Sequence, residues 1–210
     1  NGAGKTTLFN LLSGELRPQS GSIHLAGREV TRLTPDRRAR LGLARSFQRN
    51  NVFPQLSVRE NLSFGDLAAT GQAGIFWRPI RRRGRDERAV ERAADLVGIR
   101  ELLERRVSDL SYGAVRQLEI GLALVSSPKL LLLDEPTSGM SPEETGRILR
   151  LLGGLPRDLT MVIIEHDMPL VFELADRITV LDHGKVLESG SVEQIRGSAR
   201  VRAVYLGEAG

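Results

Sequence analysis

Apolar strands alternate with amphipathic helices along most of the chain. Residues 130–134 (LLLLD) and 160–165 (TMVIIE) have apolar interiors, which is typical of strands covered on both faces of a sheet. Residues 6–13 and 114–125 carry apolar positions at helical spacing. This alternation predicts an α/β fold with a mostly parallel sheet between layers of helices.

Capping and turn signals predict the remaining elements. Ser57 and Glu60 form a capping box that opens a helix to about residue 67, and Thr34-Pro35 opens a short helix to residue 41. We also expect strands at 22–27 and 43–47, a helix at 86–97, helices capped by Ser141 and Asp167, and two strands around the Asp-His-Gly turn at 182–184.

Residues 50–112 contain no apolar strand, unlike the chain on either side. We therefore expect a single domain over residues 1–210, in which an α/β core of residues 1–49 and 113–210 carries residues 50–112 as an inserted helical subdomain. An arginine-rich loop at residues 71–85 lies within this insertion. It could contact lipid headgroups or membrane subunits, but a solvated loop is the simpler interpretation.

Composition narrows the functional classes. Hydrophobic residues make up 40% of the chain, and no apolar run reaches the roughly 18 residues that a transmembrane helix needs. The absence of cysteine excludes disulfides and cysteine-ligated zinc. The net charge is +4, and much of the excess of basic over acidic residues lies between residues 78 and 92. Aromatic residues make up only 4% of the chain. This pattern disfavours a nucleic-acid-binding face.

The first residues, NGAGKTT, match the second half of a phosphate-binding loop. In such a loop, backbone N–H groups and the start of the following helix bind phosphate, Lys5 reaches the phosphate oxygens, and the Thr6 hydroxyl ligates Mg²⁺. The short match alone fits an ordinary turn before a helix equally well. The first glycine of the full pattern would precede Asn1, so we expect this sequence to begin inside the loop.

Acidic side chains follow the apolar run LLLL. Asp134 and Glu135 come at the carboxyl end of this strand, where an aspartate can hold Mg²⁺ and a glutamate can polarise an attacking water. His166 follows the next apolar strand and could donate to a γ-phosphate, and Gln48 follows a shorter one. Each residue alone is common at the surface of an α/β protein, but after a phosphate loop they indicate a nucleotide site.

A second anion site is predicted at LSYG, which precedes the helix at residues 114–125. Ser111 and the backbone N–H of Gly113 lie at the start of that helix, where the helix dipole favours an anion. The alternative is an ordinary serine N-cap. Two anion sites in one chain either bind separate anions or meet across a dimer.

These motifs together resemble the ATP-binding subunits of ABC transporters over essentially the whole chain. The resemblance identifies a Walker A segment at 1–7, a Q-loop glutamine at 48, a signature at 110–114, a Walker B motif at 130–135, a D-loop at 138–141 and a switch histidine at 166. It implies a P-loop NTPase (RecA-like) core that uses ATP and Mg²⁺ and couples ATP hydrolysis to transport.

The resemblance also implies roles for the site residues. Glu135 is expected to be the general base, His166 the γ-phosphate sensor, and Gln48 a contact to the metal or to the attacking water. Thr6, Gln48 and Asp134 would hold Mg²⁺. The expected ATP-binding residues are Asn1, Gly2, Ala3, Gly4, Lys5, Thr6, Thr7, Ser111 and Gly113.

The partners implied by the resemblance are protein subunits and not nucleic acid. They are a second ATP-binding subunit, identical or a paralogue, in a head-to-tail dimer, then transmembrane permease subunits, and indirectly a solute-binding protein. Ser111 and Gly113 would meet the ATP held by the partner. The protein would lie peripherally on the cytoplasmic side of the membrane.

Several segments are similar to the ATPases of branched-chain amino acid importers. They are LARSFQ, the tyrosine of LSYG, SGMSP, EHDMPLV, the terminal YLGE and the long loop before residue 86. A lipopolysaccharide-export ATPase shares the Tyr-Gly signature, so export stays an alternative. A soluble ABC ATPase that handles DNA or ribosomes is disfavoured, because the chain lacks long coiled-coil segments, zinc cysteines and a second cassette.

The chain departs from the family pattern at three places. Ala114 replaces the usual glutamine or glutamate, and Ser141 stands where many members have aspartate. The family's first strands, its adenine-stacking aromatic residue and its first Walker glycine would precede Asn1. We therefore expect the chain as given to bind ATP poorly.

Overall fold

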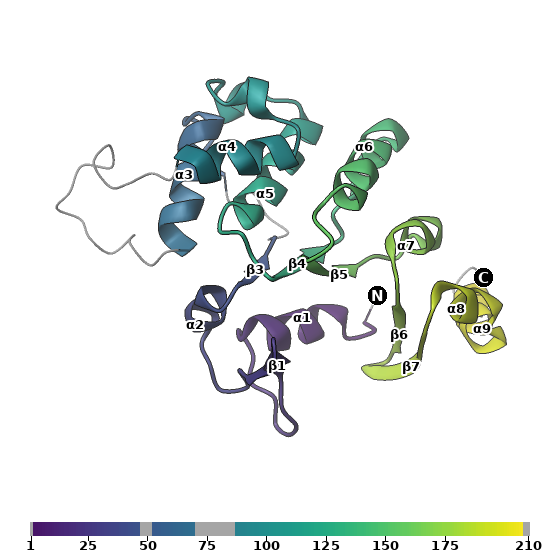
Figure 1. The fold of residues 1–210 in the computed structure, drawn as a ribbon. Coiled ribbons are helices and arrows are strands. Elements are labelled where there is room, and N and C mark those ends of the chain that lie inside the picture. Colours follow the sequence, from purple (N-terminus) through teal and green to yellow (C-terminus); the bar gives the residue numbers. More distant parts are fainter. Residues whose placement is uncertain (1, 47–51, 70–86, 208–210) are drawn as a thin grey trace.

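The computed structural model describes residues 2–46, 52–69 and 87–207 (Figure 1). The helices are α1 (Lys5–Ser13), α2 (Pro35–Arg40), α3 (Val58–Ala69), α4 (Glu87–Leu96), α5 (Tyr112–Leu124), α6 (Pro142–Gly153), α7 (Met168–Leu174), α8 (Val192–Gly197) and α9 (Ala199–Gly207). The strands are β1 (His24–Leu25), β2 (Arg28–Glu29), β3 (Leu43–Arg45), β4 (Leu130–Asp134), β5 (Thr160–Ile164), β6 (Ile178–Asp182) and β7 (Lys185–Gly190). Short 3₁₀ helices span Arg100–Leu102 and Val107–Asp109.

A parallel sheet in the order β3-β4-β5 lies at the centre of the molecule. Side chains of β4 alternate between its faces, as the pleat of a strand requires. Leu131 and Leu133 pack with the cluster built from α3 to α6, whereas Leu132 packs with Phe9 of α1. In Figure 1, α1 accordingly lies on one side of the sheet and α5 and α6 on the other. The prediction of a parallel sheet covered on both faces is confirmed.

Two short hairpins flank this sheet. β1 and β2 pair antiparallel around Ala26 and Gly27, which have φ angles of 48° and 78°. The strand predicted at 22–27 is therefore wrong in its extent, because the chain reverses where a continuous strand was expected. β6 and β7 pair antiparallel around the predicted Asp-His-Gly turn. The strand predicted at 43–47 ends at Arg45, and Phe47 lies outside the described residues.

Helix starts follow the predicted caps in most places. Ser57 and Glu60 exchange hydrogen bonds between side chain and backbone, and Ser141 and Glu144 do the same at the start of α6. Thr34 and Asp167 occupy N-cap positions, but neither side chain accepts a capping hydrogen bond from a backbone N–H of its helix. The Thr34 hydroxyl instead donates to the carboxylate of Asp36.

Helices α3, α4 and α5 pack against one another through a shared apolar cluster. Gly121 in α5 permits this approach, because a Cβ there would lie 3.2 Å from Val97 and 3.3 Å from Leu62. The division of the chain into a core and an inserted helical subdomain stays a prediction. Residues 71–85, the predicted arginine-rich loop, lie outside the described residues.

A buried arginine closes the C-terminal end of α1. The Arg38 side chain is 0% exposed and donates hydrogen bonds to the carbonyl oxygens of Leu11 and Leu12 at 2.7 Å each. It also donates to the carbonyls of Leu33 and Thr31. These bonds satisfy helix-end acceptors and offset the desolvation that lowers the pKa of the guanidinium.

The last segment packs as a small apolar cluster around Ile178, Ile195 and Val201. It joins the β6–β7 hairpin to α7, α8 and α9 at the C-terminal side of the molecule in Figure 1. Within the part of the chain that the structure describes, no helix has the length and apolar character to cross a bilayer.

Candidate functional site

The start of helix α1 is open to solvent. Gly2 and Gly4 have φ angles of 89° and 91°, in the left-handed region that favours glycine, and α1 begins at Lys5. No described side chain caps this end, and Thr6 and Thr7 are exposed in the first turn. The first N–H groups of a helix lack partners within the helix and bind anions well. Gly2 to Thr7 therefore form an uncapped helix start at which phosphate binding stays a prediction, while Asn1 lies outside the described residues.

The loop before α1 rests on the β6–β7 turn, a contact that the sequence did not predict. The backbone N–H of Gly184 donates to the carbonyl oxygen of Ala3 at 3.0 Å. A Cβ at Gly4 would lie 3.1 Å from the Cα of Gly184. The Asp-His-Gly turn was visible in the sequence, but no local signal links it to the loop before α1, which is distant along the chain.

Three predicted side chains meet at the carboxyl end of the sheet. The Glu135 carboxylate, just after β4, has one oxygen 4.0 Å from Lys5 Nζ and 3.4 Å from His166 Nδ1. The side chains of Lys5 and Glu135 are each 29% exposed, so their mutual attraction contributes little to stability. The arrangement leaves a cation, a carboxylate and an imidazole accessible around one point, which suits a reacting phosphate.

Asp134 lies beside this group and is buried. The residue is 3% exposed, and no described group forms a hydrogen bond with its Oδ2. Burial raises the pKa of this carboxyl, while Arg45, whose Nη2 lies 3.9 Å from Oδ2, opposes the shift. A buried carboxylate oxygen without a hydrogen bond is a suitable ligand for a hard divalent cation.

Of the other two predicted Mg²⁺ ligands, Thr6 and Gln48, the structure describes only Thr6. The Thr6 hydroxyl is exposed at the start of α1, and Gln48 lies outside the described residues. The described residues contain no group of three or more acidic, histidine or cysteine side chains placed to hold a metal ion. One carboxylate and one hydroxyl fit Mg²⁺, because this ion usually takes few protein ligands and completes its shell with water and phosphate.

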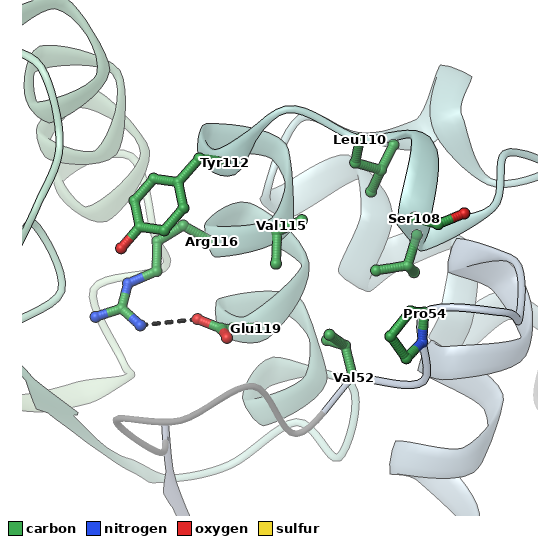
Figure 2. Close-up of a pocket in the computed structure, with 9 residues that line it drawn as sticks. Val52, Pro54, Ser108, Leu110, Tyr112, Val115, Arg116 and Glu119 are labelled. Atoms are coloured by element: carbon green, nitrogen blue, oxygen red, sulfur yellow. Dashed lines mark hydrogen bonds and ion pairs between the residues drawn. The ribbon is translucent and has the colours of Figure 1, made fainter.

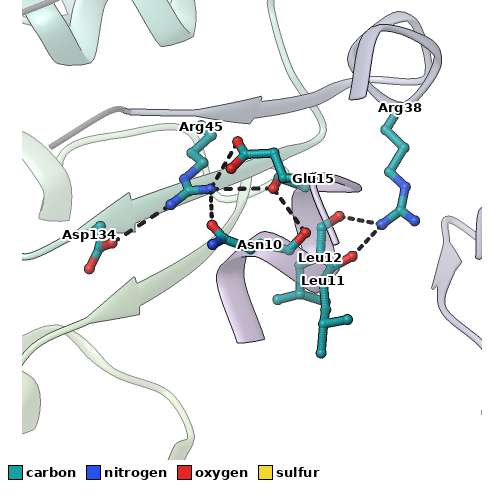
Figure 3. A network of polar contacts seen from close by, with 8 residues as sticks. Asn10, Leu11, Leu12, Glu15, Arg38, Arg45 and Asp134 are labelled. Carbon is teal, nitrogen blue, oxygen red and sulfur yellow. Dashed lines mark hydrogen bonds and ion pairs between the residues drawn. The ribbon is translucent and has the colours of Figure 1, made fainter. Parts of the chain in front are cut away.

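Arg45 fixes the strand next to Asp134 and was missed as a site residue. Its Nη1 donates to Asn10 Oδ1 at 2.8 Å and to Glu15 Oε1 at 3.1 Å, so it ties β3 to α1 (Figure 3). Its guanidinium also lies over the ring of Phe9, 5.8 Å from the centroid. The only signal for it was a charged residue within the predicted strand LARSF.

The LSYG segment starts α5, as expected. Ser111 is the N-cap, and its Oγ accepts a hydrogen bond from the N–H of Ala114 at 3.3 Å. Ser111 is exposed, Gly113 is partly exposed, and Ala114 is buried. Among the described residues, no hydrogen bond or ion pair joins Ser111 or Gly113 to Lys5, Glu135 or His166. The structure thus describes two separate helix starts, and it does not bring them together within one chain.

A pocket of about 340 Å³ lies beside the start of α5 (Figure 2). Its lining mixes apolar and polar surface, with an ion pair of 2.7 Å between Arg116 and Glu119 at one side. The lining residues are Val52, Pro54, Val107, Ser108, Leu110, Tyr112, Val115, Arg116 and Glu119. The pocket therefore offers apolar surface together with a fixed pair of charges.

The sequence matches the family model described as ABC transporter over residues 1–138. Over its full length the chain is 40% identical to the high-affinity branched-chain amino acid transport ATP-binding proteins LivG of Escherichia coli and BraF of Pseudomonas aeruginosa, and it covers 85% of each. The fold matches an ATP-binding cassette of an ABC transporter in its ADP conformation with a TM-score of 0.82 and 26% identity, covering 99% of this chain and 85% of that one.

Proposed function

We propose that this chain, which belongs to the ABC transporter family of ATP-binding proteins, powers the uptake of branched-chain amino acids or related small solutes. The family's activity, ATP hydrolysis coupled to transport, is the chain's biochemical function. One observation carries the assignment of the catalytic centre: the Glu135 carboxylate lies between Lys5 and His166 at the carboxyl end of β4. The full-length similarity to LivG and BraF supports the solute class.

Phosphate binding is assigned to the start of α1. The N–H groups after Gly4 point out of the helix end, and the flexible Lys5 side chain lies beside them. The weak pair between Lys5 and Glu135 lets the ammonium group turn to phosphate oxygens at little cost. The exposed Thr6 hydroxyl and buried Asp134 would hold Mg²⁺, with Gln48 as a further ligand. When bound, this ion neutralises charge on the phosphates.

Hydrolysis is assigned to Glu135 and His166. Water attacks the γ-phosphorus, the bond from that phosphorus to the ADP oxygen breaks, and the carboxylate of Glu135 accepts the water proton. The His166 ring lies 3.4 Å from the same carboxylate and is 65% exposed, so it can turn to donate a hydrogen bond to a γ-phosphate oxygen. The protein's main contributions are positioning and charge stabilisation.

A composite site between two subunits explains the second helix start. Ser111 and Gly113 are accessible but make no contact with Lys5, Glu135 or His166 of their own chain. In a head-to-tail dimer, each chain would present these residues to the ATP bound by its partner. The partner is an identical chain or a paralogue.

The pocket beside α5 is assigned to a transmembrane permease subunit. Its mixed apolar and polar lining and the Arg116–Glu119 pair suit a short helix that carries both apolar and polar side chains. Contact there would hold this protein peripherally at the cytoplasmic face of the membrane. A solute-binding protein would act on the opposite face of the same transporter.

Transport tests the solute assignment directly. The complete complex, with its permease subunits and solute-binding protein, is placed in vesicles, and ATP-dependent uptake of labelled leucine is measured. We expect uptake that isoleucine and valine inhibit by competition and that lysine leaves unchanged. ATP hydrolysis without leucine uptake would contradict the proposed solute, and ATP-dependent extrusion of lipid would support an exporter instead.

A further inference from the structure

Helix α5 holds the backbone that carries Glu135. Arg116 Nη2 donates to the carbonyl oxygen of Glu135 at 2.8 Å, and Nε donates to that of Pro136 at 2.9 Å. The third nitrogen, Nη1, is held by Glu119 Oε2 at 2.7 Å. The side chains of Arg116 and Glu119 are 11% and 9% exposed, so this fork is shielded from water. A planar guanidinium with each nitrogen engaged has little freedom to move.

The backbone at Glu135 needs such support. Its φ angle is 45°, a left-handed conformation that is uncommon for a residue with a side chain. Such conformations persist where the surroundings fix them, and they concentrate at functional sites. The N–H of Glu135 donates to Ile164 of β5 at 2.9 Å, and its carbonyl accepts from Arg116. Both sides of the unusual φ angle are thus fixed by neighbours.

Further contacts hold the segment that follows. The Tyr112 hydroxyl, at the start of α5, donates to the carbonyl oxygen of Ser138 at 3.1 Å. Glu165, at the end of β5, accepts from the Thr137 hydroxyl at 2.8 Å. The Arg116 contacts are distinct, because they reach the peptide of Glu135 itself and therefore bear on the direction of its side chain.

We propose that Arg116 is a positioning residue for ATP hydrolysis. By holding the carbonyls of Glu135 and Pro136, it keeps Glu135 in the left-handed conformation that directs the carboxylate between Lys5 and His166. This inference rests on the proposed role of Glu135 as the general base. It also means that the helix that begins with Ser111 and Gly113, assigned to the partner's ATP, fixes the catalytic carboxylate of its own chain.

The Arg116→Met variant tests the proposal, because methionine keeps an unbranched apolar stem and removes every donor. In the intact protein we expect kcat to fall about 10- to 100-fold, as a displaced catalytic group predicts, while KM for ATP changes less than about 3-fold. Arg147→Met, which removes an exposed arginine paired with Glu143 on α6, is the control and should keep wild-type kcat. Wild-type kcat in Arg116→Met would overturn the proposal.

A double-mutant cycle separates positioning from a general structural effect. If Arg116 acts through Glu135, adding Arg116→Met to Glu135→Gln should change the residual single-turnover rate by less than about 2-fold. An equal proportional loss in both backgrounds would contradict the proposal. If Glu135→Gln kept wild-type hydrolysis, the assignment of Glu135 as the general base would fail. If Glu135→Gln lost hydrolysis but Arg116→Met did not, only the positioning role of Arg116 would be rejected.

Arg116→Lys keeps the proposal testable if the methionine variant does not fold. Lysine retains the positive charge beside Glu119 but cannot bond to both carbonyls through a planar fork. We expect thermal unfolding near that of the wild type and kcat lower by about 10-fold. Wild-type kcat in this variant would show that the fork to the two carbonyls is not needed.

Discussion

The two ends of helix α1 are built in opposite ways. At the C-terminal end, Arg38 is 0% exposed and donates to the carbonyls of Leu11 and Leu12, so these acceptors at the end of the helix are satisfied within the protein. At the N-terminal end, Gly4 leaves the first N–H groups without a described side-chain cap, and Lys5 forms only a loose pair with Glu135. The closed end serves stability, and the open end is available to a ligand.

Figure 3 shows a similar contrast between two arginines, Arg38 and Arg45. Arg38 bonds only to neutral carbonyl oxygens, whereas Arg45 joins charged and polar side chains and lies 3.9 Å from Asp134. The sequence alone does not reveal this difference between Arg38 and Arg45. Their partners show that the first completes the fold and the second borders the site.

The largest effect is expected at the open end of α1. Lys5→Ala removes the cation proposed to bind the phosphates, and ATP hydrolysis should fall about 10²- to 10³-fold. The unfolding free energy should change little, because the Lys5–Glu135 pair is partly exposed. Lys129→Ala, at an exposed position before β4, is the control for loss of a lysine. The rate of ATP hydrolysis and the free energy of unfolding in urea are measured on the intact protein. A large loss of stability in Lys5→Ala would contradict the assignment of this helix end to ligand binding.

The closed end should show the reverse pattern. Arg38→Met leaves four partly buried carbonyl oxygens without their donor, so the free energy of unfolding should fall by about 2–4 kcal/mol. The hydrolysis rate per folded molecule should stay near that of the wild type. Arg37, which is exposed on α2 next to Arg38, provides the matched control. The Arg37→Met variant should unfold at the same urea concentration as the wild type. An Arg38→Met protein as stable as this control would show that the carbonyl contacts contribute nothing.

The smallest effect is expected at Asp134, where burial raises the pKa of the carboxyl above its ordinary 3.8. Between pH 3.8 and the raised value, the folded state binds more protons than the unfolded state, so stability falls as the pH rises through that interval. At neutral pH the charged, buried carboxylate therefore destabilises the fold. Asp134→Asn should unfold at a higher urea concentration than the wild type at pH 7, and the difference should shrink below pH 4.

The stability of Asp134→Asn at pH 7 can also contradict this prediction. If Asp134→Asn were less stable than the wild type at pH 7, the Arg45 contact would outweigh the cost of burial. Asn10→Ala, which removes one partner of Arg45 but leaves both charges, controls for loosening of the network around β3. Its stability difference from the wild type should not vary with pH across this interval.

The sequence predicts the elements that periodicity governs. The apolar runs of β4 and β5 and the caps at Ser57 and Ser141 appear where expected, because burial and local capping act over a few residues. The meeting of Lys5, Glu135 and His166 also follows from the rule that parallel strands end at one sheet edge. The family motifs and the sheet order lead to the same site.

The contacts that the sequence does not reveal are those made by long side chains between distant segments. Arg38, Arg45 and Arg116 look alike in the sequence, as arginines within predicted helices or strands. Their roles depend on which carbonyls and carboxylates the fold brings near. The turn at Ala26 was missed for a different reason. It lacks the Asn-Gly or Asp-Gly pair that usually marks a two-residue hairpin.

Glu135→Gln removes the carboxylate that we propose as the general base of the ATPase site at the end of β4. ATP binding and hydrolysis are measured in the intact protein beside Glu143→Gln, which alters an exposed carboxylate on α6. We expect ATP affinity close to that of the wild type, with hydrolysis lower by about 100-fold or more in Glu135→Gln and unchanged in the control. Wild-type hydrolysis by Glu135→Gln would contradict the general-base role.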